Sequence, residues 1–138
     1  MTLNNYKILE LNNSNKNGYV YSKDIMEKVI DNWKEKGKKL GEFKTNNNSL
    51  SKTNLLHISH KVNDLKIEGN DVIGDIEIYD TPYGTLCQEL VNNGHELKFV
   101  PKMIMESKEL MDENGNKVKE FIPQELISID IYGDKLDI

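Results

Sequence analysis

Apolar residues at helical spacing predict a first helix over 22–36. Five of them form one continuous face: Ile25, Met26, Val29, Ile30 and Trp33. Ser22 stands before this face as a helix N-cap, with Asp24 in the first turn, where a negative charge is favourable. Gly37 follows the last apolar position and is expected to end the helix. We therefore expect an amphipathic helix that buries this face.

A second helix is predicted after residue 80. Thr81 is suited to the N-cap, and Pro82 is suited to the first helical position. The expected apolar face consists of Leu86, Leu90 and Val91. Gly94 is expected to stop this helix.

Alternation with a period of two predicts the strands. The clearest case is the segment 71–78, in which one face is apolar or small: Val72, Gly74, Ile76 and Ile78. Asp75 and Glu77 occupy the other face, which predicts a half-buried antiparallel strand. The Gly69-Asn70 turn joins it to a strand that follows Leu55.

Further strands are expected at 6–11, 39–43, 96–106 and 118–132. The stretch DENGN (112–116) predicts a hairpin between the last two, and Pro123 indicates an edge or a bulge. The sequence thus predicts one α+β domain over residues 1–138. We expect a mixed, mainly antiparallel β-barrel-like core of about six or seven strands with two flanking helices.

The polar stretch TNNNSLSKTN (45–54) contains a single apolar residue, Leu50. Such a segment buries little apolar area to offset the entropy cost of ordering it. We expect a mobile loop here.

The composition of the chain argues against some classes of binding partner. The net charge of −5 does not favour nucleic acid or an anionic membrane, and all 18 basic residues are lysines, which lack the bidentate grip of arginine. Cys87 is the only cysteine, so no internal disulfide forms. No apolar run reaches the roughly 18 residues of a membrane span, and no signal-peptide pattern is present. These features favour a cytoplasmic protein.

Several side chains could carry chemistry. Ser59 lies between His57 and His60, a set suited to nucleophilic catalysis. On a regular strand, however, Ser59 and His60 point to opposite faces, so we interpret the histidines as structural or surface residues. Cys87 has no cation beside it in the sequence and reads as an inert thiol. No cluster of metal ligands and no cofactor motif is evident, so neither a metal nor a cofactor is expected.

Charged strand residues also have two interpretations. Lys98 and Lys102 share one expected strand face, with Val100 between them. They could bind an anion, but lysine is also common on exposed strands, where it favours solubility. The carboxylates of Asp75, Glu77 and Asp80 lie near one another in the sequence and could perform acid–base chemistry, although an outward strand face normally carries such charges.

The order and spacing of several segments resemble the prohead (head maturation) proteases of tailed bacteriophages, whose fold is related to the herpesvirus assemblins. The matching segments are NGYVYSKDIMEKVI (17–30), GEFKTN (41–46), HISHKVNDLKIEGNDVIGDIEIYDTPYGTL (57–86), GHELKFVPKM (94–103) and ISIDIY (127–132). The resemblance covers most of the chain. It implies a mixed β-barrel-like core with flanking helices, which agrees with the periodicity.

The resemblance also implies where the catalytic residues should lie, and this chain departs from the family there. The family motif G-E-L-x-H-P places the catalytic histidine at Thr45, and the motif G-x-x-L-G-x-S-S-R-G places the serine at Val100 or Pro101. Asp130 is retained in the last strand. Valine and proline carry no nucleophilic atom, and threonine is no general base near neutral pH. The resemblance therefore implies a protease scaffold without its catalytic pair.

Three functional hypotheses follow. The first is a non-catalytic phage protein that binds phage head or scaffold proteins, in the host cytoplasm or the virion, and that could assemble as a homo-oligomer. The second is a phage-encoded protein that holds a small anionic ligand, such as a host defence signal, in the former active-site cleft. Its candidate binding residues are Ser59, His60, His95, Lys98 and Lys102. The third is a peptidase with a relocated nucleophile, Ser59 or Cys87.

Overall fold

The protein is described by a computed structural model in four segments: 1–11, 21–45, 55–111 and 113–133. The strands are β1 (Thr2–Glu10), β2 (Leu40–Lys44), β3 (Ile58–Glu68), β4 (Asp71–Ile78), β5 (Phe99–Met111) and β6 (Lys117–Tyr132). The helices are α1 (Lys23–Lys36), α2 (Pro82–Asn92) and a short 3-10 turn, η2 (Leu55–His57). The expected loop at 45–54 lies outside the described residues except for Thr45.

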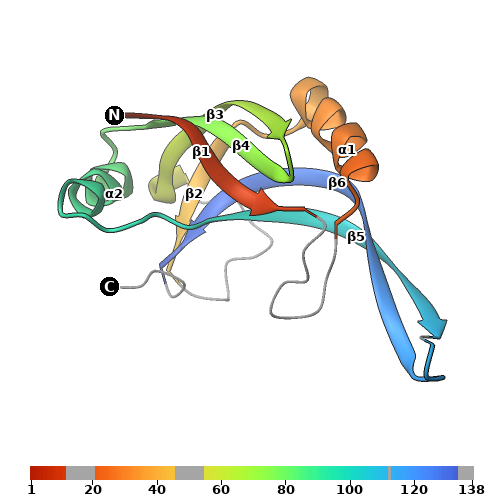
Figure 1. Ribbon diagram of the computed structural model, residues 1–138. Coiled ribbons are helices and arrows are strands. Elements are labelled where there is room, and N and C mark those ends of the chain that lie inside the picture. Colours follow the sequence, from red (N-terminus) through yellow and green to blue (C-terminus); the bar gives the residue numbers. More distant parts are fainter. Residues whose placement is uncertain (12–20, 46–54, 112, 134–138) are drawn as a thin grey trace.

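Six strands form one strongly bent sheet in the order β1-β4-β3-β2-β6-β5 (Figure 1). All the strand pairs are antiparallel except β2 with β6, which run parallel, among the residues described. The predicted α+β class is confirmed, with six strands in a mixed, mainly antiparallel sheet and two helices. The sheet is not closed into a barrel, because its edge strands β1 and β5 do not pair.

Side chains bridge the two open edges of the sheet. The Tyr6 hydroxyl donates a hydrogen bond to the carbonyl oxygen of Leu97 at 2.6 Å, just before β5 begins. The Tyr6 ring also meets Phe99 edge to face, with 5.4 Å between ring centroids. These contacts bring β1 and the start of β5 together without a backbone ladder.

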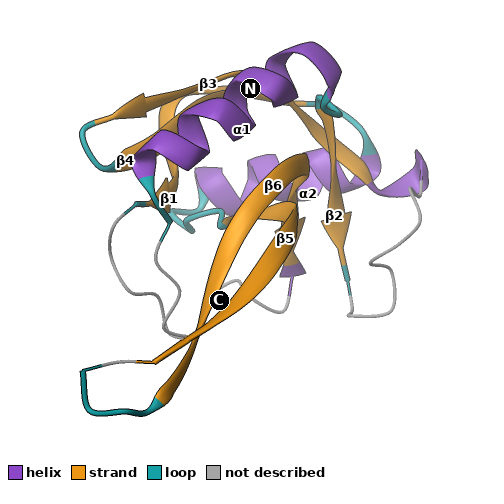
Figure 2. Ribbon diagram, turned by 90° about the vertical axis from the view of Figure 1, so that its right-hand side faces the viewer, coloured by secondary structure: helices purple, strands orange, loops and turns teal. Residues whose placement is uncertain are grey.

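Helix α1 packs on the sheet beside β6, and α2 lies at the other end of the molecule (Figures 1 and 2). The predicted face of α1 is buried through Met26, Val29, Ile30 and Trp33. Ser22 does occupy the N-cap, but its side chain makes no capping hydrogen bond.

Gly37 ends α1 as expected. Its φ of −74° lies in the extended region, which most residues can adopt. A Cβ atom there would lie 2.0 Å from Cδ1 of Trp33. Glycine is therefore needed because the chain passes directly over the buried indole.

Helix α2 begins as predicted. Thr81 is its N-cap, and the threonine hydroxyl accepts a hydrogen bond from the Gly84 amide at 3.1 Å. The expected role of Leu86 was wrong, since this side chain is 39% exposed. The buried residues of α2 are Gly84 and Cys87 instead. Because neighbouring residues of a helix are turned about 100° from each other, Leu86 points away from the buried side of Cys87.

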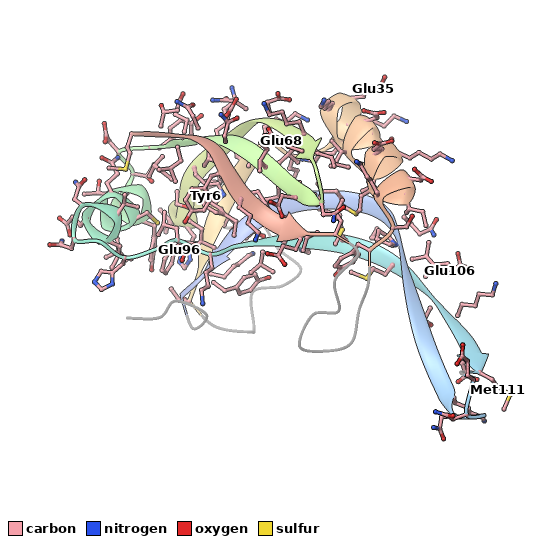
Figure 3. All side chains as sticks on the ribbon, viewed as in Figure 1. Tyr6, Glu35, Glu68, Glu96, Glu106 and Met111 are labelled. Atoms are coloured by element: carbon pink, nitrogen blue, oxygen red, sulfur yellow. The ribbon has the colours of Figure 1, made fainter. Side chains whose placement is uncertain are left out.

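Both predicted hairpins are present. Gly69 has a φ of +63° in the turn between β3 and β4, and Gly115 has a φ of +79° between β5 and β6. Asp112 lies outside the described residues. The β5–β6 hairpin extends well beyond the rest of the sheet (Figures 1 and 3). The pairing of β6 with β5 shifts register on either side of Ile127 and of Gln124, so β6 bulges next to Pro123.

Candidate functional site

Three neighbouring strands bring together the positions to which the resemblance assigns the catalytic residues. Thr45 follows the end of β2, which pairs with β6 through Phe43 and Ile131. On the other side of β6, Val100 of β5 lies directly opposite Asp130. Thr45 just after the end of β2, Val100 of β5 and Asp130 of β6 thus lie in one region of the sheet. Asp130 is 2% exposed, whereas Thr45 is exposed.

The core of this region is a group of buried polar side chains. One carboxylate oxygen of Asp130 accepts a hydrogen bond from the backbone amide of Glu42 at 3.0 Å. The other accepts from the Ser128 hydroxyl at 3.2 Å. The Lys44 ammonium lies 3.4 Å from a carboxylate oxygen of Glu42, and only 2% of the lysine side chain is exposed. A buried ion pair and two hydrogen bonds to Asp130 therefore occupy this region.

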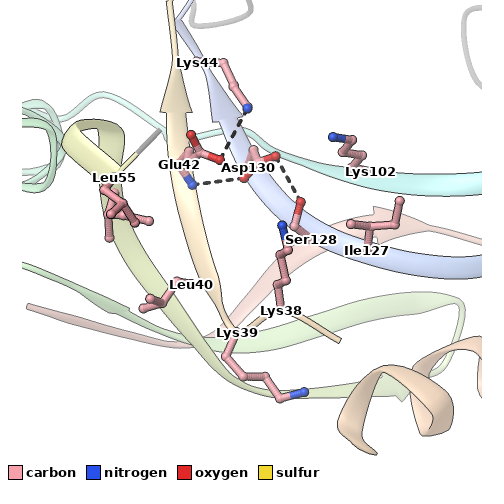
Figure 4. Close-up of a pocket in the computed structure, with 11 residues that line it drawn as sticks. Lys38, Lys39, Leu40, Glu42, Lys44, Leu55, Lys102, Ile127, Ser128 and Asp130 are labelled. Carbon is pink, nitrogen blue, oxygen red and sulfur yellow. Dashed lines mark hydrogen bonds and ion pairs between the residues drawn. The ribbon is translucent and has the colours of Figure 1, made fainter. Parts of the chain in front are cut away.

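A cavity of about 270 Å³ opens over this group (Figure 4). Its polar lining comes from Lys38, Lys39, Glu42, Lys44, Lys102, Ser128 and Asp130. Its aliphatic lining comes from Leu40, Leu55, Ile58 and Ile127. A strand irregularity in β6 shapes it. The bulge at Ile127 lets this residue and the adjacent Ser128 both face the cavity.

Only one of the five predicted binding residues, Lys102, lines this cavity. His95 is half-buried just after α2, and its backbone amide donates to the carbonyl of Leu90 at 2.9 Å. Lys98 is exposed and precedes β5. Ser59 and His60 are 0% exposed and lie in the interior of the protein.

The expectation that Ser59 and His60 cannot interact was wrong. The Ser59 hydroxyl lies 2.7 Å from Nδ1 of His60. Pairing of β2 with β3 shifts register between Gly41 and Glu42, which leaves Ser59 as an extra residue on β3. A bulge of this kind re-aims side chains, so that neighbouring residues no longer point to opposite faces.

The protonation state of His60 follows from its partners. Its Nε2 lies 2.8 Å from the carbonyl oxygen of Ile129, which can only accept, so Nε2 carries the proton and Nδ1 accepts from the Ser59 hydroxyl. Burial lowers the pKa of His60, and the bond to Ile129 and the charge of Asp130 offset only part of this effect. The imidazole is therefore neutral near pH 7.

Cys87 is also buried, with 0% exposure, as its position in α2 requires. Burial raises the pKa of its thiol to about 11. The thiolate, which is the nucleophilic form, is scarce near neutral pH. Among the residues described, no group of three or more His, Cys, Asp or Glu side chains could hold a metal ion. No helix in the described segments has the length and apolar character that crossing a membrane requires.

Sequence reasoning missed Glu42, Lys44, Lys38 and Ser128. One signal was available: Glu42 and Lys44 carry opposite charges two positions apart on a strand, so they share a face. The sequence contained no sign that this face is covered. Such a pair normally marks a solvated face.

The bent, open sheet with α1 and α2 near its ends is a prohead-protease-like α+β fold. Among solved structures, the chain is similar to the bacteriophage T4 capsid assembly protease, gp21, with a TM-score of 0.63 and 15% sequence identity. The similarity covers 96% of this chain and 90% of that chain. No family model and no curated protein matches the sequence. At this level of identity the comparison confirms the fold that the motifs implied.

Proposed function

We propose that this chain is a non-catalytic protein on a prohead-protease-like fold, and that it acts by binding in phage head assembly or in its regulation. Its binding partners would then be head or scaffold proteins, in the host cytoplasm or in the virion. The similarity to a capsid assembly protease supports this setting. The replacement of the catalytic positions supports the absence of proteolysis.

The proposal rests on which side chains occupy the region where Thr45, Val100 and Asp130 meet. Threonine at position 45 supplies no general base, and valine at position 100 supplies no nucleophile. The neighbouring interior is filled by the Glu42–Lys44 ion pair, at 3.4 Å. The retained acid, Asp130, is engaged by the Glu42 amide and Ser128. A protease of this fold would need a histidine and a serine at these places.

A relocated nucleophile is disfavoured by burial. Ser59 donates to a histidine, as a catalytic serine does, but both residues are 0% exposed. A peptide bond cannot approach within the roughly 3 Å that attack requires unless the sheet opens. Cys87 is equally buried, and its raised pKa keeps it protonated.

The cavity favours a second candidate, a protein that holds a small anionic ligand. Four lysines and two acids line a concave site of about 270 Å³ with an aliphatic wall. Such a mixture of apolar surface and a few convergent polar groups is typical of small-molecule sites. A phage-encoded protein that binds a host defence signal would fit this description. In both candidates the protein binds a partner or a ligand and does not cleave peptide bonds.

A direct test combines cleavage and association in one sample. The purified protein is incubated with phage scaffold and capsid proteins, and the products are followed by mass spectrometry and by co-sedimentation. We expect intact partner proteins, and co-sedimentation would support the head-assembly role. Cleavage that disappears in Ser59→Ala or Cys87→Ala would contradict the proposal.

A further inference from the structure

The β5–β6 hairpin carries an open edge of the sheet. Strand β5 pairs with β6 on one side, and among the described residues no strand pairs with its other side. The contacts of Tyr6 with Leu97 and Phe99 lie only at the start of β5. Farther along, the hairpin projects from the rest of the molecule, as Figure 3 shows at Glu106 and Met111. The exposed residues of this part of β5 are Glu106, Ser107, Lys108, Glu109 and Met111.

The projecting part of this edge is regular. From Met105 to Met111, each residue of β5 pairs with one residue of β6 without a register shift. Every second residue of such an edge strand directs its N–H and C=O groups away from the neighbouring strand. The opposite edge differs, because β1 pairs with β4 through two register shifts and Asn5 has a φ of +53°. Such irregularities protect β1 from adding a strand, whereas the regular part of β5 can accept one.

The charges along β5 favour one pairing of this edge with a second copy of itself. When two copies of one edge pair antiparallel, the residue at the centre lies opposite its own copy. A centre at Glu106 or Lys108 therefore sets like charges against each other, and a centre at Met105 sets Lys102 against Lys108. A centre at Ser107 places Glu106 of each copy opposite Lys108 of the other. This register forms two pairs of opposite charges.

Two further centres are less favourable. A centre at Glu109 places this carboxylate opposite its own copy. A centre at Ile104 places Lys102 opposite Glu106, but it brings the second copy alongside Pro101, which has no amide to donate, and toward the start of β5, where β1 already makes contact. Charges of alternating sign thus disfavour the neighbouring registers and favour one, which is how charged interfaces select a partner.

The register centred on Ser107 also covers exposed apolar surface. It places Met111 of each copy opposite Met103 of the other. Met111 is 71% exposed, whereas Met103 is partly buried against the core. Methionine side chains are flexible and adapt readily to a new neighbour. Pairing therefore removes apolar surface from water at both ends of the paired stretch.

We propose that two copies of this chain associate through β5, antiparallel and centred on Ser107, so that their two sheets become one sheet across a twofold axis. The inference concerns self-association and goes beyond the proposed binding in head assembly, on which it does not depend. A single strand pair is a small interface, so the association is expected to be weak and reversible.

Sedimentation velocity of the full chain between about 10 µM and 1 mM covers the range of a weak association. We expect the sedimentation coefficient to rise with concentration from that of a monomer toward that of a dimer. Amide hydrogen exchange, followed by nuclear magnetic resonance, should slow at every second residue between Met103 and Met111 in the concentrated sample. A monomer throughout this range would overturn the inference. A dimer whose protected amides lie outside β5 would overturn it as well.

Exchanged charges test the register. Glu106→Lys and Lys108→Glu each set like charges against each other at two places, so each should weaken self-association about tenfold. An equimolar mixture of the two variants restores opposite charges at both places, as does the double variant, so both samples should associate like the wild type. Glu113→Lys is the control, because it changes the net charge as Glu106→Lys does, at an exposed residue outside the paired stretch.

The mixture also separates the dimer from effects within one chain. Gln124 donates a hydrogen bond to Glu106 at 3.4 Å, and Lys108 lies opposite Glu120 in the hairpin, so each single variant also changes its own hairpin. Association that is lost in both variants and recovered in their mixture cannot arise within either chain. Single variants that associate like the wild type, or a mixture that stays monomeric, would overturn the inference.

Discussion

His60 of β3 donates a hydrogen bond from Nε2 to the backbone carbonyl oxygen of Ile129 on β6, at 2.8 Å. Strand β2 lies between these two strands in the sheet. The imidazole crosses β2 at Gly41, where an added Cβ would lie 2.0 Å from Nε2. The histidine thus joins two strands that do not pair with each other, next to the strand position of Asp130.

This relationship predicts how stability depends on pH. Because the pKa of folded His60 is lowered, the unfolded chain binds a proton below about pH 6.5 that the folded protein cannot bind. Stability contributed by neutral His60 is therefore present above that pH and is lost as the pH falls. The limiting slope for one such proton is about 1.4 kcal/mol per pH unit.

His60→Gln should lower the free energy of unfolding at neutral pH and reduce its slope between about pH 7 and pH 5. Urea unfolding at a series of pH values measures both quantities. Ser59→Ala is the matched control, because it removes the 2.7 Å hydrogen bond and leaves the imidazole in place. Equal slopes in the wild type and His60→Gln would show that His60 does not cause the loss.

Gly41→Ala should destabilise the protein by about 3 kcal/mol or more, because the new methyl group overlaps both His60 and the carbonyl oxygen of Ile129. Gly69→Ala is the control. It has open space but a φ of +63°, so it should cost about 1–2 kcal/mol through backbone strain alone. Denaturant midpoints measure both changes. If Gly41→Ala costs no more than Gly69→Ala, the close crossing is absent in solution.

The buried ion pair should show strong coupling. Glu42→Leu and Lys44→Met each leave one buried charge without this 3.4 Å partner, and each should cost about 3–5 kcal/mol. The double variant should cost less than the sum of the two, since it buries neither charge. A double-mutant cycle by urea unfolding measures the coupling energy, and simple additivity would argue against the pair.

Trp33→Ala should cost about 3–5 kcal/mol, because the indole is 1% exposed and packs between α1 and the chain at Gly37. Leu86→Ala, at a 39% exposed leucine, should change stability by about 0.5 kcal/mol or less. The denaturation midpoints of both variants should be compared with the wild type. An unchanged midpoint for Trp33→Ala would place the indole at the surface.

Cys87 should resist thiol reagents in the folded protein. With a pKa raised to about 11, only about one thiol in a thousand is ionised at pH 8, and the side chain has no exposed surface. Labelling with iodoacetamide should be slow in buffer and rapid in guanidinium chloride. Fast labelling of the native protein would reopen the hypothesis of a cysteine nucleophile.

The sequence by itself determined those elements whose burial pattern is local. The alternation of Val72, Ile76 and Ile78 defined the buried face of β4, and the apolar stripe through Trp33 defined that of α1. Thr81 and Pro82 located the start of α2, because a cap and a missing amide act within one turn. The motif order also indicated the fold, since it places these elements in sequence along the chain.

Only the tertiary structure decided the chemistry of the site. Glu42 and Lys44 look like a solvated strand face, yet parallel pairing of β2 with β6, which is distant in sequence, helps to bury them. Ser59 and His60 should point apart on a regular strand, and a register shift against β2 brings them together. Both results depend on which strands pair and in what register. Those choices are set by contacts between distant segments, which no local pattern encodes.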